Sequence, residues 1–289
     1  MSNRDLGLAF VVIAVWGVNF VALRLGLANM PPMLMVFIRF MLSAFPAVFF
    51  LRRPNVAWRY LIIYGLCMGA LQATFLYSAL KLGMPAGLSS VIAQTQAFFT
   101  LGMAALILKE RVRVNQVVGM AISVCGLAVI ALRFDQPVGI IPLLLVLASA
   151  LSWGISNLIV RLIGKVDMLP FVVWSSLAPP LPMLALSIMT EGTPQIMTAL
   201  SGATLITLLA TLYTAYLSTV LGYTLWTRLI GKYGAGRIAP FSLLVPFFGL
   251  SSTALVLGEA ITPMTLLAGG LILTGLAINV FGGNLRMTR

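Results

Sequence analysis

Long apolar runs alternate with short polar stretches along the whole chain. Each run is close to the roughly 20 residues that an α-helix needs to cross the hydrocarbon core of a bilayer. The ten runs are Leu6–Leu25, Pro32–Leu51, Tyr60–Leu80, Ala86–Leu108, Val114–Leu132, Val138–Val160, Met168–Met189, Thr204–Trp226, Ile238–Leu257 and Pro263–Phe281. The connections between them leave no room for a separate soluble domain. The pattern therefore predicts an all-α integral membrane protein with ten transmembrane helices.

The composition agrees with lipid as the main solvent. Of 289 residues, 61% are hydrophobic and only 8% are charged, whereas about a quarter of a soluble domain is charged. Apolar surface is unproblematic against lipid tails. Cys67 and Cys125 fall within expected spans, where we expect them to act as small apolar side chains. With no histidine and no metal-binding spacing, the sequence indicates no cofactor and no metal site.

The net charge of +12 reflects membrane topology rather than nucleic-acid binding. If the N-terminus is cytoplasmic, 14 of the 18 lysines and arginines lie at cytoplasmic ends of the spans, three at outer ends, and Arg39 within a span. Cytoplasmic loops of membrane proteins carry such an excess. We therefore expect both termini inside, with anionic lipid headgroups as partners and no nucleic acid. The oligomeric state is left open.

One phrase occurs twice in the chain. Residues 15–24 read VWGVNFVALR and residues 152–161 read SWGISNLIVR, so Trp, Gly and Arg recur 137 positions apart. At a spacing of 149, Phe98-Phe99 matches Phe247-Phe248 and Glu110 matches Glu259. These matches predict two five-helix repeats, residues 1–135 and 136–289, with extra residues in the segment 191–202. Because five is odd, the second repeat is inverted, a plan typical of secondary transporters.

The repeated motifs also carry a resemblance. WGVNF in the first span, LKER closing the fourth and LGEA closing the ninth resemble the EamA family of the drug/metabolite transporter superfamily. GMPAGLSSVIAQTQAFFT (residues 83–100) and RIAPFSLLVP (residues 237–246) are most similar to members that export O-acetylserine and cysteine. The resemblance implies a bacterial inner-membrane exporter of small amino-acid metabolites, with a cavity lined by spans one, three and four of each repeat.

Polar and aromatic residues in spans one and six are candidates for substrate binding. Trp16 and Asn19 are three residues apart and share a helix face. Trp153 and Asn157 lie at the matching depth in span six. A polar side chain within a membrane is functional by default, although amides also join helices through hydrogen bonds. The repeated tryptophan favours a cavity wall.

Spans four and nine supply different polar groups. Gln94 lies about 12 Å from the outer end of its helix, close to the bilayer centre, and is the better ligand candidate. Gln96 points elsewhere, and we expect it to make an interhelical hydrogen bond. In span nine, Pro240 and Pro246 free backbone carbonyls in the preceding turn. They either offer those carbonyls to the substrate or bend the helix.

Charged and phenolic residues complete the candidates. Arg39 is the one clear charge within a span, and it either has a structural role or attracts a substrate carboxylate. Tyr223 lies deep enough to face a ligand, although aromatic belts at the interface explain many such residues. We expect Glu110 and Glu259, both at helix C-termini, to organise turns.

These features favour a secondary exporter of small neutral amino-acid metabolites of the cysteine or O-acetylserine type. Export or import of other metabolites, such as aromatic amino acids, stays open. No acidic residue lies at mid-membrane, so a proton relay through a titrating side chain is not expected. An ATP-driven primary pump is not expected, because the chain lacks a P-loop. A membrane protease or acyltransferase is disfavoured because the chain lacks the histidine of a Ser–His pair. Direction and energy coupling are left open.

Overall fold

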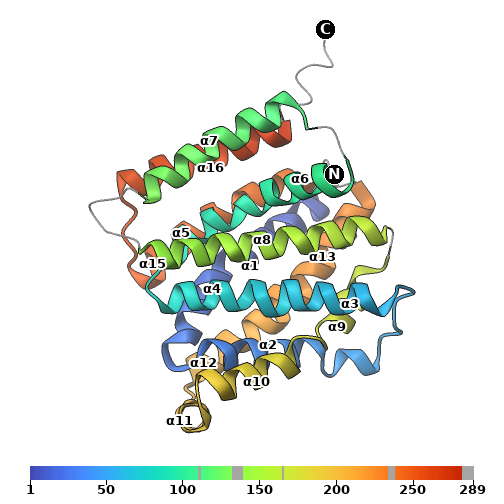
Figure 1. Ribbon diagram of the computed structural model, residues 1–289, viewed down its shortest axis with the longest axis vertical. Helices are drawn as coiled ribbons and strands as arrows, with labels where there is room; N and C mark the ends of the chain where they lie inside the picture. The colour runs from blue at the N-terminus through green and yellow to red at the C-terminus, as the bar shows by residue number, and fades with distance from the viewer. Residues whose placement is uncertain (110–111, 132–138, 165, 234–237, 282–289) are drawn as a thin grey trace.

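The computed structural model describes residues 1–109, 112–131, 139–164, 166–233 and 238–281, with the side chains of residues 227, 230, 231, 239, 240, 280 and 281 outside the description. All secondary structure in these ranges is helical (Figure 1), which confirms the all-α prediction. Seven helices are long and apolar enough to cross a membrane. Three shorter apolar helices cover Val114–Ile130, Phe241–Leu257 and Pro263–Asn279. The number of crossings stays a prediction.

The helices follow the expected runs along the chain. Residues 1–131 form α1 (Asn3–Asn29), α2 (Pro32–Ala44), η1 (Ala47–Phe49), α3 (Trp58–Tyr64), η2 (Gly65–Leu71), α4 (Gln72–Lys81), α5 (Ala86–Ile92), η3 (Ala93–Thr95), α6 (Gln96–Ile107) and α7 (Val114–Ala131). Residues 140–281 form α8 (Ile140–Ile163), α9 (Met168–Ser175), α10 (Pro180–Thr190), α11 (Thr193–Ser201), α12 (Leu205–Leu212), η4 (Tyr213–Leu221), α13 (Gly222–Tyr233), η5 (Ala239–Leu244), α15 (Val245–Leu257) and α16 (Pro263–Phe281).

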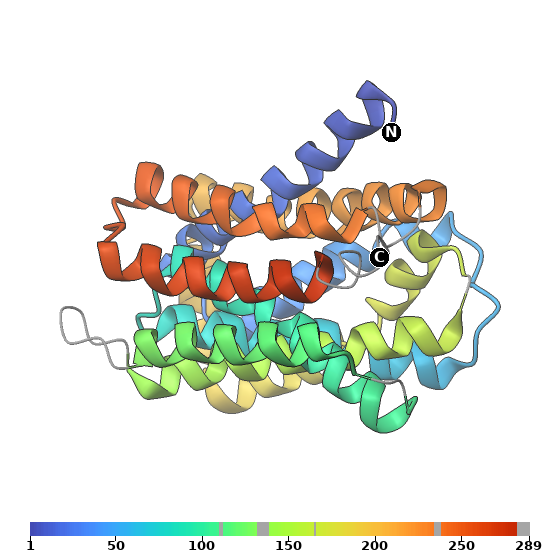
Figure 2. The same ribbon diagram turned by 90° about the horizontal axis from the view of Figure 1, so that it is seen from above.

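The helices lie roughly side by side in one bundle. Figure 1 shows α7 and α16 together at one edge and α2, α10 and α12 near the other. α1 begins and α16 ends toward the same end of the bundle (Figure 1), and the first turns of α1 project from one face of it (Figure 2). Large apolar side chains on the outside suit lipid: Leu106, Met189 and Leu255 are 82%, 82% and 86% exposed.

Six of the apolar runs contain an interruption, and the interruptions occur in pairs. η2 and η4 are π-helical turns within the third and eighth runs, and η3 and η5 are 3-10 turns within the fourth and ninth. The prediction of one continuous helix was wrong for Pro32–Leu51, because α2 ends at Ala44 and Pro46 follows. A proline disfavours helical backbone in the residue before it and removes a donor. The seventh run is broken in the same way before Pro180.

The glycine of the repeated phrase is explained by two tight helix contacts, that of α1 with α15 and that of α8 with α6. A Cβ on Gly17 would collide with Phe248 of α15, and a Cβ on Gly154 would collide with Phe99 of α6. Gly154 lies 137 positions after Gly17, and Phe248 lies 149 positions after Phe99. The two contacts are therefore equivalent: in one the glycine comes from the first half of the chain and the phenylalanine from the second, and in the other the reverse holds. Glycine recurs because each helix presses its backbone against a helix that carries the matched phenylalanine.

The helices α7 and α16 show the same exchange. A Cβ on Gly119 would meet the backbone oxygen of Gly275, and one on Gly126 would meet the backbone oxygen of Ala268. Moving each residue by 149 positions converts the first contact into the second. The packing of α7 against α16 therefore stays the same when the two helices are exchanged.

Two glutamates cap helices from elsewhere in the bundle. Glu259 accepts from the backbone N–H groups of Ala86 and Gly87 at 2.7 and 2.8 Å, at the start of α5. Glu191 accepts from Met33 and Leu34 at 2.7 and 3.1 Å, at the start of α2. A carboxylate at a helix N-terminus satisfies free donors and complements the helix dipole. Glu259 thus organises a helix end, as expected, while Glu110 lies outside the described residues.

Candidate functional site

A central cavity of about 1070 Å³ lies between the helices. Its wall contains residues from α1, α2, α4, α6, α8, α13 and the irregular turns between them. Seven residues singled out from the sequence are among those that line it. They are Trp16, Asn19, Arg39, Gln94, Trp153, Asn157 and Tyr223. Side chains that are up to 207 positions apart in the sequence therefore face one space, which has the concave form typical of a ligand site.

Aromatic rings form one part of the cavity wall. The ring of Trp16 lies 5.5 Å from that of Tyr223 and 5.2 Å from that of Trp226, between centroids. Its indole Nε1 donates to the backbone oxygen of Ser218 at 3.0 Å, within the π-helical turn η4. Because that N–H is already used, Trp16 offers the cavity its ring face rather than a donor.

Two buried amides lack a protein partner. Asn19 is 9% exposed and its Oδ1 accepts no hydrogen bond within the described part of the chain. Gln94 is 5% exposed, and no described residue makes a hydrogen bond with its side chain. A buried amide without a partner carries a desolvation penalty of about 1–3 kcal/mol. Both amides line the cavity, where a ligand or water can satisfy them.

Asn157 and Gln96 bond to each other. Asn157 Nδ2 donates to Gln96 Oε1 at 2.6 Å and to Thr100 Oγ1 at 3.2 Å. These bonds join α8 to α6, and the expected interhelical role of Gln96 agrees with them. Both amides also line the cavity. The expectation that Gln96 points elsewhere was therefore wrong, because the 3-10 turn at Ala93–Thr95 changes the faces that follow it.

The two prolines of span nine differ from these amides in how they relate to the cavity. Pro246 is buried in the first turn of α15, where the missing N–H would be unpaired in any helix. It is not among the residues that line the cavity in the described part of the chain. The backbone around Pro240 is the 3-10 turn η5, and its side chain lies outside the description. Ser242 and Val245 from this region line the cavity instead.

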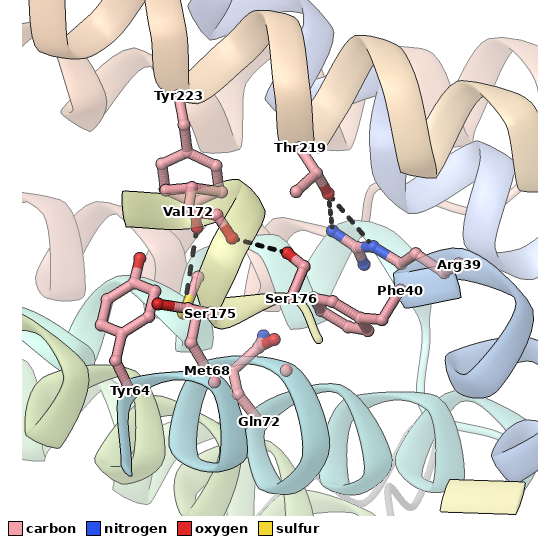
Figure 3. Close-up of a pocket in the computed structure, with 12 residues that line it drawn as sticks. Arg39, Phe40, Tyr64, Met68, Gln72, Val172, Ser175, Ser176, Thr219 and Tyr223 are labelled. Carbon is pink, nitrogen blue, oxygen red and sulfur yellow. Dashed lines mark hydrogen bonds between the residues drawn. The ribbon is translucent and has the colours of Figure 1, made fainter. Parts of the chain in front are cut away.

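Arg39 reaches the cavity from α2 and is held by two neutral hydroxyl groups. Its Nη2 and Nε donate to Thr219 Oγ1 at 2.9 and 3.3 Å, and its Nη1 donates to Tyr77 OH at 2.7 Å (Figure 3 shows the Thr219 contacts). No acidic side chain pairs with Arg39 among the described residues; the one ion pair they contain joins Lys232 to Asp5. The guanidinium charge therefore stands in the cavity wall without a counter-charge.

The cavity wall continues to one end of the bundle, and two cationic side chains join helix ends at the other. Exposed Asp167 and Arg228 extend the lining at the first end. At the opposite end Arg24 Nη1 donates to the backbone oxygen of Leu80, and Lys81 Nζ donates to that of Leu27 at 2.8 Å. These reciprocal contacts tie the C-terminal ends of α1 and α4 together and satisfy carbonyls that a helix end leaves free.

The sequence model of the EamA-like transporter family matches residues 5–132 and again residues 140–281. The chain belongs to this family. The members of this family are transporters, and with its apolar helices the chain is a multi-pass membrane protein. The resemblance stated from the sequence is thereby confirmed.

Individual relatives cover the EamA-like chain from end to end. It is 43% identical to a Salmonella typhimurium protein named "Probable amino-acid metabolite efflux pump", with 100% of this chain and 98% of the relative aligned. It is 41% identical to an Escherichia coli protein of the same name, over 98% and 96% of the two chains. A crystal structure with 16% identity superposes with a TM-score of 0.63 over 99% of this chain and 100% of the other. That likeness concerns the fold alone.

Sequence reasoning missed several residues that line the cavity of this EamA-like protein. Gln72, Tyr64 and Ser218 belong to or adjoin the π-helical turns. Gln72 was detectable, because it is an amide within an apolar run, like Gln94. Nothing in the sequence marks the π-helical turns themselves. Partners far along the chain support them: Ser43 Oγ donates to the backbone oxygen of Ala215 at 3.2 Å within η4.

Proposed function

We propose that this protein is a secondary transporter that exports small neutral amino-acid metabolites, of the cysteine and O-acetylserine type, across the bacterial inner membrane. The observation that carries the proposal is the chemistry of the cavity wall. A cation that no described acidic residue pairs with, the buried Asn19 Oδ1 that accepts no bond from a described residue, and aromatic faces all meet in one cavity. The names of the two relatives that are more than 40% identical, amino-acid metabolite efflux pumps, support it.

Arg39 is the proposed contact for the substrate carboxylate. Arg39 is half-buried in the cavity wall, and its neutral contacts with Tyr77 and Thr219 supply no opposite charge. A carboxylate entering the cavity would supply that charge and accept two parallel bonds from the guanidinium. The substrate would thus complete an electrostatic arrangement that the protein leaves incomplete.

The ammonium end of an amino acid needs acceptors rather than a second cation. Asn19 Oδ1 is a buried acceptor without a partner in the described part of the chain, and Gln94 adds a second amide oxygen. The ring faces of Trp16 and Trp226 attract an ammonium group through their quadrupoles. A zwitterion therefore fits this wall better than an anion or a lipophilic cation.

A second candidate substrate class is the aromatic amino acids. The cavity of about 1070 Å³ exceeds what cysteine or O-acetylserine fills, and the Trp16, Tyr223 and Trp226 rings suit stacking. The carboxylate and ammonium contacts would be the same for both classes, so the metabolite that accumulates outside cells distinguishes them.

The proposed architecture is ten spans in two inverted five-helix repeats, with both termini cytoplasmic. The paired interruptions and the exchanged glycine contacts support this arrangement. In this orientation the cavity reaches the cytoplasmic end through Asp167 and Arg228, and the Arg24 and Lys81 contacts close the outer end. In this conformation the protein would take up substrate from the cytoplasm. Export would then require the Arg24 and Lys81 contacts at the outer end to break.

Replacing Gln94 by Leu tests the site. Leucine keeps the approximate size but removes the amide, so a polar group of the bound substrate is left unpaired at a cost of about 1–3 kcal/mol. We expect a roughly 5- to 150-fold loss of apparent affinity. Intracellular and extracellular amino acids are measured in cells that overexpress each protein at equal membrane abundance.

The matched control is Thr95→Val. Thr95 is 3% exposed, and its hydroxyl already donates to the backbone oxygen of Ile92 at 2.7 Å. We expect this variant to export like the wild type. Equal export by wild type and Gln94→Leu, or no change in any extracellular amino acid on overexpression, would argue against the proposed function.

Cysteine labelling tests the orientation. We expect a membrane-impermeant maleimide to modify Met197→Cys, which is 61% exposed on α11, in intact cells. It should modify exposed Asn55→Cys only after the membrane is permeabilised. Both variants are made in a chain with Cys67 and Cys125 replaced by Ala. The opposite labelling pattern would reverse the topology and the proposed direction of loading.

A further inference from the structure

A small side pocket of about 20 Å³ opens beside the cavity, near Arg39 (Figure 3). Arg39, Gln72, Tyr64 and Tyr223 line both the pocket and the cavity. A volume of this size holds about one water-sized group. The pocket therefore admits a single atom or small group from a molecule in the cavity, and not a ring or an alkyl chain.

Two buried side chains in the pocket make no hydrogen bond to the part of the chain that the structure describes. Ser175 is 1% exposed, and its Oγ makes no hydrogen bond to any described residue. Gln72 is 8% exposed, and only its backbone oxygen is used by another side chain, Ser149 Oγ at 2.9 Å. Neighbouring Ser176 differs, because its hydroxyl donates to the backbone oxygen of Val172 at 2.8 Å (Figure 3). Buried polar groups normally find hydrogen-bond partners. The Ser175 hydroxyl and the Gln72 amide therefore mark a place where a ligand atom can bind.

Residues of both π-helical turns line the pocket. Gly65 and Gly69 of η2 line it on one side and Thr219 of η4 on another. A Cβ on Gly65 would collide with the backbone oxygen of Ser175. Glycine thus lets the third run approach α9 closely enough to place Gln72 and Ser175 in one wall. Single π-helical turns within α-helices are often found at functional sites.

The pocket is rich in donors and cationic. Arg39 supplies N–H groups and a positive charge, Gln72 an amide N–H and Ser175 a hydroxyl, while none of the described residues that line the pocket is acidic. An ammonium group would be repelled by Arg39. A carboxylate oxygen accepts several bonds from such donors and carries the opposite charge.

We propose that this side pocket seats one oxygen of the substrate carboxylate, and that Gln72 and Ser175 together with Arg39 make the transporter selective for a free acid. The inference rests on the proposed function, and it adds which chemical group of the substrate the site selects. A methyl ester lacks the negative charge that Arg39 would pair with, so it keeps a carbonyl oxygen for the pocket but loses the charged contact. A carboxamide is neutral, and its N–H groups would face the N–H and O–H donors of the pocket. Both analogues are therefore poor ligands.

Competition in proteoliposomes tests the inference with the full chain. Counterflow of radiolabelled O-acetyl-L-serine, L-cysteine and L-phenylalanine first identifies a transported amino acid. The unlabelled acid and its methyl ester then compete with that substrate. We expect the ester to need a concentration at least tenfold higher than the acid in the wild type.

The variants separate the proposed contacts from packing. Ser175→Ala and Gln72→Leu should each raise the half-inhibitory concentration of the acid by roughly 5- to 20-fold and leave that of the ester unchanged. The ratio of ester to acid then falls toward one. The hydroxyl of Ser176 already donates to the backbone oxygen of Val172. We therefore expect Ser176→Ala to keep the wild-type ratio of ester to acid.

Two results would overturn the inference while leaving the proposed function intact. One is equal competition by acid and ester in a wild type that transports the acid. The other is an unchanged ratio in both Ser175→Ala and Gln72→Leu, which would mean that the pocket holds only water. A wild type that transports none of the three amino acids contradicts the proposed function itself, and the inference with it.

Discussion

Replacing Arg39 by Gln is expected to lower the apparent affinity for the exported amino acid by roughly 30- to 1000-fold, the largest effect of any cavity substitution. Removing one partner of a buried charge pair costs about 2–4 kcal/mol, because the other charge is left unpaired. In this variant the substrate carboxylate would be the unpaired charge. Counterflow of the transported amino acid at equal protein content measures the change.

Two further variants distinguish binding from structural support by Arg39. Arg39→Lys keeps the charge but loses the planar fork, and we expect an intermediate loss of affinity. Tyr77→Phe removes the hydroxyl that accepts from Nη1 but leaves the charge in place, so we expect only a few-fold loss. Near-normal affinity in Arg39→Gln, or an equal loss in Tyr77→Phe, would assign Arg39 a structural role.

Replacing Gly17 by Val is expected to prevent normal assembly of the bundle. Its side chain would meet Phe248 Cβ, and also the backbone oxygen of Val245 and the backbone N of Gly249, both at 2.9 Å from the first added carbon. Overpacking costs about 1–3 kcal/mol where side chains can move, and backbone atoms cannot move as easily. We expect a clear fall in membrane abundance and in the thermal unfolding temperature in detergent.

A glycine in the same helix provides the control. A Cβ on Gly7 meets no atom within 4 Å, so Gly7→Val should be tolerated. Gly154→Val should cause a loss like that of Gly17→Val, because Gly154 packs against Phe99 in the equivalent way. Normal abundance of both Gly17→Val and Gly154→Val would show that the close approach of these helices is not required.

The candidate site was only partly predictable from the sequence. An amide or an arginine in an apolar run is visible without a structure, because lipid makes an unpaired polar group costly. Asn19, Gln94 and Arg39 were found in this way. Ser175 could not be found, since serine is common in membrane helices and usually bonds to its own helix, as Ser176 does. Its lack of a partner depends on how Gly65 positions the neighbouring helix.

The sequence by itself determined the all-helical membrane class and the positions of the apolar runs. These properties follow from hydropathy and spacing, which act along the chain. The tertiary structure alone decided where the helices break into π and 3-10 turns, which amides stay unpaired and that a side pocket lies beside Arg39. The physical reason is that a backbone carbonyl freed by an irregular turn must find its partner elsewhere in the bundle, as Ser218 does with Trp16.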